Sequence, residues 1–264
     1  MKNIIAIILF SVAYNLSAQE QIITDRPDQT ESPNAVGIGV LQIETGVLFE
    51  RTEINSRLSE HRIVYPTNLF RIGVAKKLEL RIVNEIVSYK TVDNTMQKEL
   101  SKISGTENMQ VGFKYQLSES DKRAIIGIMA HVVVPTGSRG ISNQKYGVLS
   151  RINVSYDLTE NRNISGNFGY NNTDLRFSDD NGLVRDEDGD FTYTLVYGHS
   201  LNDRLGVYLE AFGDYVNFED WVNNMDAGFT YLLNDNIQLD YSYGWGLNQV
   251  MNYHSIGISV RVGQ

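Results

Sequence analysis

The chain has 264 residues, no cysteine, 22 glycines, four prolines and a formal net charge of −9. The absence of cysteine excludes a disulfide framework and a thiolate metal site, and an acidic chain without a basic stripe is a poor nucleic-acid binder. The length suits one large domain, and no internal run approaches the ~20 apolar residues that a membrane helix needs. These observations do not exclude a membrane β-barrel, because only alternate residues of its strands face lipid and no long apolar run is needed.

The only continuous apolar segment lies at the N-terminus. Lys2 precedes an apolar stretch over residues 4–13, and the small residues Ser17 and Ala18 follow it. This order of charge, apolar core and small residues predicts a secretory signal peptide over residues 1–18. The alternative is a buried N-terminal strand or helix. A cleaved signal peptide implies export, and we expect the mature protein in the outer membrane of a Gram-negative cell.

A polar segment separates the signal peptide from the first predicted strand. Residues 20–39 read "EQIITDRPDQTESPNAVGIG", in which Pro27 and Pro33 each remove a ladder donor and restrict the preceding residue. We therefore expect residues 19–38 to form a separate N-terminal periplasmic or plug segment, and residues 39–264 to form the main domain.

Twelve segments of the main domain carry the alternation typical of β-strands. In "LFRIGVAKKLELRI", apolar residues occupy every second position before a polar turn and again after it, with Arg71 and Arg81 among the residues between them. A period of two is the strand period, and a turn as short as "AKK" predicts a hairpin. The predicted strands are 40–50, 62–74, 78–89, 107–117, 123–134, 147–157, 163–172, 191–199, 204–216, 224–232, 236–245 and 253–262.

The connections between these strands alternate in length. Every second connection is short and polar, as in "SESDK" and "LTENR", and the others are longer, as in "KTVDNTMQKELSKISGT" and "TDLRFSDDNGLVRDEDGD". An even number of antiparallel strands with tight turns at one end and long loops at the other is the plan of outer-membrane barrels. The sequence therefore predicts an all-β, antiparallel up-and-down transmembrane β-barrel of about 12 strands, with short periplasmic turns and longer extracellular loops.

The charged residues on these strands are expected to face the inside of the barrel. A soluble lipocalin-like barrel would show the same alternation with its apolar side inward, but ~8 strands is the width that side chains can just fill, so twelve would leave a void. The inward charges have both signs, so they either line a solute path or pair across strands and hold a narrow lumen closed. The predicted lumen residues are Glu44, Arg71, Glu79, Arg81, Glu85, Lys114, Arg151, Glu210, Asp214, Asp226, Asp240 and Arg261.

Several stretches resemble one known family. "TDRPDQTESP" at 24–33, "GVLQIETGVLFE", "LFRIGVAKKLELRI", "VGFKYQL", "VVVPTG", "VYLEAFG" and the C-terminal "DAGFTYLLNDNIQLDYSYGWGLN" are similar to the outer-membrane transporter family named for the meta-pathway of phenol degradation. The resemblance runs from about Thr24 to the C-terminus. It implies a transporter-type barrel, often assigned to uptake of aromatic or other hydrophobic compounds. Inference from a fold family to a solute is analogy.

The N-terminal segment contains the most specific part of this resemblance. It carries Asp25, Arg26, Asp28 and Glu31 at the periplasmic end of a barrel whose lumen holds several arginines. We expect the segment to fold into the periplasmic mouth as a plug, with Asp25 and Arg26 paired to lumenal charges, and to gate passage. The alternative is a flexible periplasmic leader that only assists export or assembly.

Motifs for catalysis or metal binding are sparse. The sequence has no G-x-S-x-G, H-E-x-x-H or phosphate loop, and the four histidines lie in different segments. The acidic run at Asp186, Asp188 and Asp190 departs from a calcium loop in the position of its glycine and lacks the later glutamate, which favours a solvated extracellular loop. We expect no catalytic residue, no metal and no cofactor.

These observations predict an outer-membrane β-barrel transporter or channel for uptake of small solutes, aromatic or hydrophobic compounds among them. Two alternatives are an outer-membrane barrel enzyme of the lipase type, with Ser and His assembled across strands, and a structural barrel with a closed lumen. The expected partners are outer-membrane lipids, a small-molecule solute and the barrel-assembly machinery, and not a nucleic acid.

Overall fold

The computed structural model describes residues 21–263, apart from 121, 179–181 and 185–188. The predicted signal peptide, and Asp186 and Asp188 of the acidic run, therefore lie outside the described residues. The described residues contain fourteen strands, β1 to β14, and no helix long and apolar enough to cross a membrane. The strands are β1 (Leu41–Glu53), β2 (Leu58–Ala75), β3 (Leu78–Asp93), β4 (Lys98–Thr106), β5 (Met109–Gln116), β6 (Ala124–Val134), β7 (Tyr146–Thr159), β8 (Arg162–Ser178), β9 (Gly182–Val184), β10 (Asp190–Ser200), β11 (Leu205–Val216), β12 (Asp220–Asn234), β13 (Ile237–Gly246) and β14 (Met251–Val262).

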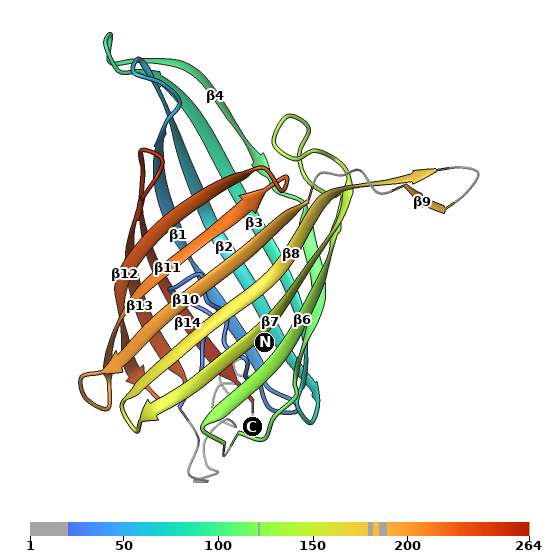
Figure 1. The fold of residues 1–264 in the computed structure, drawn as a ribbon, viewed down its shortest axis with the longest axis vertical. Coiled ribbons are helices and arrows are strands. Elements are labelled where there is room, and N and C mark those ends of the chain that lie inside the picture. Colours follow the sequence, from blue (N-terminus) through green and yellow to red (C-terminus); the bar gives the residue numbers. More distant parts are fainter. Residues whose placement is uncertain (1–20, 121, 179–181, 185–188, 264) are drawn as a thin grey trace, which may run out of the picture.

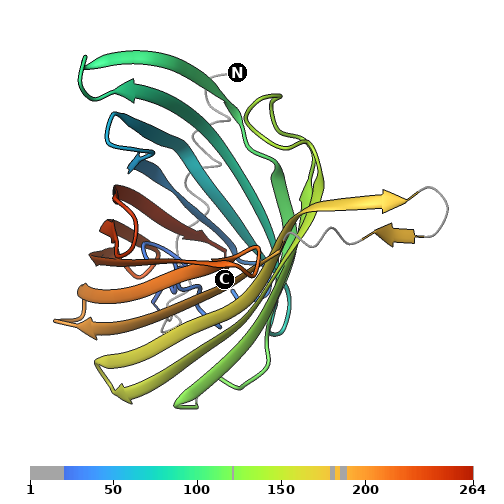
Figure 2. The same ribbon diagram turned by 45° about the horizontal axis from the view of Figure 1, so that its top comes forward.

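One antiparallel sheet closes on itself as a barrel (Figures 1 and 2). Neighbouring strands in the chain pair in order, β14 pairs with β1, and β8 pairs with β10. β4 and β5 share one place in the wall, because both pair with β3, and β9 pairs only with the end of β8. The barrel wall therefore has twelve strand positions, which confirms the predicted up-and-down barrel of 12 strands.

The prediction of a loop over residues 90–106 is wrong, because most of these residues form strands. β3 continues to Asp93 and the chain returns as β4, so that this side of the barrel rises well above the rest (Figure 1). Nearly all of β4 is exposed. Because both of its faces are wet, this hairpin does not need the alternation by which membrane strands are recognised.

The two faces of the membrane strands follow the predicted alternation. Val111, Phe113 and Tyr115 on β5 are exposed on the outside, whereas Lys114 between them is completely buried. The same holds for Leu80 outside and Arg81 inside on β3. Apolar side chains therefore face lipid and charged side chains face the interior, as in outer-membrane barrels.

Aromatic residues cluster on the outer wall near the extracellular ends of β8, β10, β11 and β12. Tyr215 stacks on Trp221 with ring centroids 4.7 Å apart, and Phe168 stacks on Phe191 at 5.4 Å. Such belts are typical of the membrane interface. Tyr89 is not part of this belt, because it lies on the inward face of β3, where it donates a hydrogen bond to Glu107.

The topology can be checked with single cysteines, because the native chain has none. We expect Met96→Cys, in the β3–β4 turn, to react with a membrane-impermeant maleimide on intact cells. Asn202→Cys, in the equally exposed β10–β11 turn at the other end, should react only after the outer membrane is permeabilised. Labelling of Asn202→Cys and not of Met96→Cys on intact cells would reverse the orientation.

Candidate functional site

The structure places the predicted lumen residues on the inner face of the barrel. Arg151, Glu85 and Asp214 are half-buried there, and Arg261 lies at the periplasmic rim, where it hydrogen bonds the β12–β13 turn. The other predicted lumen residues are buried: Glu44, Arg71, Glu79, Arg81, Lys114, Glu210, Asp226 and Asp240.

Charges on β1, β2 and β3 form a tight network on one side of the lumen. Arg71 donates to Glu79 at 2.9 Å and to Glu44 at 3.0 Å. Arg81 donates to the same Glu79 at 2.8 Å. Because these residues occupy inward positions on neighbouring strands, the sheet register brings opposite charges together, which buried charges require.

The N-terminal segment, residues 22–38, lies inside the barrel and completes this network. Asp25 accepts hydrogen bonds from Arg81 at 2.6 Å and from Lys114 at 2.7 Å, and its carboxylate lies 3.5 Å from Arg71. Burial alone would raise the pKa of the Asp25 carboxyl, but the three cations outweigh it and hold this pKa well below its usual range. Asp25 therefore stays ionised among three buried cations.

Arg26 points to the part of the wall next to the one that Asp25 binds, formed by β13, β14, β1 and β2. Its guanidinium forms an ion pair with Asp240 at 3.0 Å and donates to Ser255 at 2.9 Å. Gly46 and Gly257, which face each other on β1 and β14, leave the space for it, since a side chain at either position would collide with the guanidinium. Arg26 also donates a hydrogen bond to Thr67 on β2 at 3.1 Å, so adjacent residues of the segment bind neighbouring parts of the wall.

Residues after Pro27 carry the segment across to β7, β8, β10 and β11. Thr30 donates to Glu210 at 2.5 Å, and the Glu31 amide donates to Asn167 at 2.6 Å. Asn153 donates to the Glu31 carbonyl at 3.0 Å, and the Glu31 carboxylate lies 3.3 Å from Arg81. The segment is therefore attached to walls on several sides of the lumen.

Sequence reasoning missed the neutral residues that hold the segment. The predicted lumen residues are all charged, whereas Asn153, Asn167 and Ser255 are uncharged partners of the segment. Another missed signal is glycine at inward strand positions. A Cβ at Gly73 would lie 1.8 Å from the carbonyl oxygen of Gly37, so this glycine allows the segment to approach the β2 backbone.

Not every predicted charge joins this network. Arg151 hydrogen bonds Asn171 at 2.5 Å instead of an N-terminal carboxylate. Glu85 shares a face with Arg81, but its charged neighbours are Arg62, Glu107 and Arg26. Among the described residues, the side chain of Asp28 forms no ion pair.

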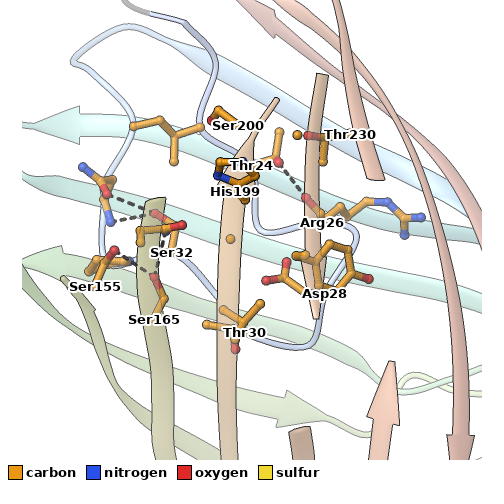
Figure 3. Close-up of a pocket in the computed structure, with 18 of the residues that line it drawn as sticks. Thr24, Arg26, Asp28, Thr30, Ser32, Ser155, Ser165, His199, Ser200 and Thr230 are labelled. Carbon is orange, nitrogen blue, oxygen red and sulfur yellow. Dashed lines mark hydrogen bonds between the residues drawn. The ribbon is translucent and has the colours of Figure 1, made fainter. Parts of the chain in front are cut away.

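A chamber of about 620 Å³ lies between the segment and the wall formed by β6 to β12. Figure 3 shows segment residues such as Asp28 and Ser32, and wall residues such as Ser155, Ser165 and Thr230, around this chamber. The wall residues come from strand ends next to the tight turns, so the chamber lies at the periplasmic end. Hydroxyl groups dominate its polar lining, and Pro27, Pro33 and Val196 are among its apolar residues.

Histidines and nearby hydroxyl or carboxyl groups are the side chains from which a catalytic or metal site could be built in the described part of the chain. Ser59 lies 3.2 Å from His61, but it is fully buried and its hydroxyl donates to Asn94, so it is not an accessible nucleophile. No group of three or more metal-binding side chains occurs among the described residues. The remaining histidines lie apart, on β6, β10 and β14: His131, His199 and His254.

Comparisons with known proteins agree with this architecture. A model of the family described as "Putative MetA-pathway of phenol degradation" matches residues 24–261. No curated protein matches the chain. A crystal structure of an outer membrane channel from Pseudomonas putida F1 superposes with a TM-score of 0.68 at 11% identity, covering 87% of this chain and 97% of that one.

Two other solved structures share the barrel less closely. The TodX monoaromatic hydrocarbon channel, as a deletion mutant, has a TM-score of 0.51 at 11% identity, covering 87% of this chain and 92% of that one. The KdgM porin, in complex with oligogalacturonate, has a TM-score of 0.51 at 8% identity, covering 83% and 98%. At these identities the likeness concerns the fold.

Replacing Arg81 tests the buried network. Arg81→Leu leaves Glu79 and Asp25 without one of their cations, and we expect it to lower the free energy of unfolding by about 3–5 kcal/mol. The matched control is Ile82→Leu, one residue away on the lipid-facing side, which should change stability little. Urea unfolding of the refolded barrel, followed by tryptophan fluorescence, measures both. Equal stability of Arg81→Leu and the parent would show that the interior is broadly wet.

Proposed function

Because this chain belongs to the family described as "Putative MetA-pathway of phenol degradation", we propose that it is an outer-membrane channel for uptake of small solutes, aromatic or hydrophobic compounds among them. The observation that carries the proposal is a closed membrane barrel whose inner face is polar and whose periplasmic end holds a solute-sized chamber. Such an interior suits passage of a solute better than packing of a solid core. The outer-membrane channels with a similar fold support this proposal.

The N-terminal segment is proposed to act as the gate of this channel. It crosses the lumen between the extracellular opening and the periplasmic chamber, and its contacts are hydrogen bonds and ion pairs instead of strand pairing. Such contacts can break and re-form without unfolding the barrel, because the sheet itself closes through β8 and β10. Asp25, Arg26 and Glu31 are the residues proposed to hold the gate shut.

The other readings of the barrel receive less support. An enzyme would need an accessible nucleophile beside a base, and Ser59 is buried. The segment inside the barrel is the observation that supports a structural barrel with a closed lumen. This function is the second candidate. Outer-membrane lipids and the barrel-assembly machinery are proposed partners, and cleavage of residues 1–18 is proposed to precede assembly.

Removing the segment separates a gated channel from a structural barrel. We expect the variant that lacks residues 22–36 to show a larger single-channel conductance in planar bilayers than the parent, because the only crossing of the described lumen is gone. A variant in which the same residues are replaced by Gly and Ser at equal length keeps the chain length and removes the anchoring charges. It should conduct like the deletion.

Heat-modifiable migration on gels first establishes that each variant has folded. Small phenols added to the parent are expected to change its current if they enter the lumen. Folded variants whose conductance equals that of the parent would contradict the gating role, and a parent and deletion that both fail to conduct would support the closed structural barrel.

A further inference from the structure

Charges are unevenly distributed around the lumen. The buried cations Arg71, Arg81 and Lys114 lie on β2, β3 and β5, where acidic residues of the wall and Asp25 surround them. The opposite wall, β11 to β13, carries only acidic charges at its predicted lumen positions: Glu210, Asp214, Asp226 and Asp240. Among the described ion pairs, the only one that reaches this acidic wall is Arg26 with Asp240.

Asp28 adds another carboxylate to this wall. It lies on the N-terminal segment and faces the chamber (Figure 3), and Asp226 is its strongest charged neighbour. Glu210 lies directly opposite Asp226 in the sheet register. Asp28, Glu210 and Asp226, here called the acidic cluster, therefore form a group of carboxyl groups without an ion-paired cation among the described residues.

One atom of the acidic cluster has no partner at all. Asp226 is completely buried, its Oδ2 atom accepts hydrogen bonds from Tyr253 and Tyr208, and its Oδ1 atom has no hydrogen-bond partner in the described structure. A buried carboxylate oxygen without a donor is costly. Burial and the negative charge of Asp226 also raise the pKa of Asp28. Both facts indicate that this place lacks a positive charge.

The chamber offers space for a cation larger than a metal ion. Its volume is about 620 Å³, and Asp28 and Tyr208 both line it. No group of described residues has the arrangement of a metal site. A tyrosine ring beside carboxylates favours organic cations, whose charge is spread over alkyl groups and can lie against an aromatic face. The hydroxyls of Thr30, Ser155 and Thr230 can accept hydrogen bonds from an ammonium group.

We propose that the chamber binds small organic cations, with Asp28 as the contacting carboxylate and Glu210 and Asp226 behind it. This proposal rests on the proposed channel function, since the site lies on the route between the gate and the periplasm. It narrows the solute class to compounds that carry an ammonium group on a small apolar body. The neighbouring Arg26 does not oppose this, because Asp240 neutralises it.

Calorimetric titration of the full refolded barrel, in non-ionic detergent at low salt and mildly alkaline pH, tests the site without requiring conduction. The probes are tetramethylammonium chloride and sodium trimethylacetate, which have similar shapes and opposite charges. We expect tetramethylammonium to bind at least about tenfold more tightly than trimethylacetate. Asp28→Asn should weaken tetramethylammonium binding about tenfold. Asp203→Asn, the same charge change in an exposed periplasmic turn, should leave it within about twofold.

Three outcomes would overturn the proposal: equal binding of the two probes, undiminished binding by folded Asp28→Asn, or equal losses in both variants, which would indicate a diffuse counterion effect. Loss of binding in Asp28→Asn with a parent that never conducts would refute the channel function and leave the cation site standing. A conducting parent that binds neither probe would refute the cation site and leave the channel function standing.

Discussion

The structure depends on one carboxylate held among three buried cations. Asp25 lies within 3.5 Å of Arg71, Arg81 and Lys114, which come from three different strands. Without this carboxylate, Glu44 and Glu79 would be the only carboxylates of the wall to balance all three cations, and Lys114 would lose the carboxylate to which it donates. If the wall and the N-terminal segment were separated, buried cations of the wall and the carboxylate of Asp25 would each lack part of their charge partners. This mutual need explains why a segment without regular secondary structure is so extensively bonded.

The same arrangement divides the lumen into two unlike halves. On the β1 to β5 side, the segment supplies the missing negative charge and the wall is neutralised. On the β11 to β13 side, Arg26 forms the one described ion pair, and the chamber lies between the segment and the strands from β6 to β12. A segment with Asp25 and Arg26 adjacent can bind both walls at once. The gate and the chamber are thus products of one short stretch of sequence.

Much of the barrel was predictable because lipid imposes a strict period on its strands. Alternation at Val111, Phe113 and Tyr115 identified both the strand and its lipid-facing side. The β3–β4 hairpin was missed because water touches both of its faces and imposes no such period. The partners of individual charges depend on strand register and side-chain reach. Sequence alone therefore could not distinguish Arg81, which binds Asp25, from Arg151, which does not.

The most direct test of the account is to lock the N-terminal segment in place reversibly. The hydroxyls of Thr30 and Thr194 lie 2.6 Å apart, and the chain contains no other cysteine to interfere with a Thr30→Cys, Thr194→Cys pair. If the segment gates the lumen, the oxidised double variant should stay at its lowest conductance in planar bilayers, and reduction should restore the openings of the parent. Equal currents before and after reduction, with the cross-link verified, would contradict the account.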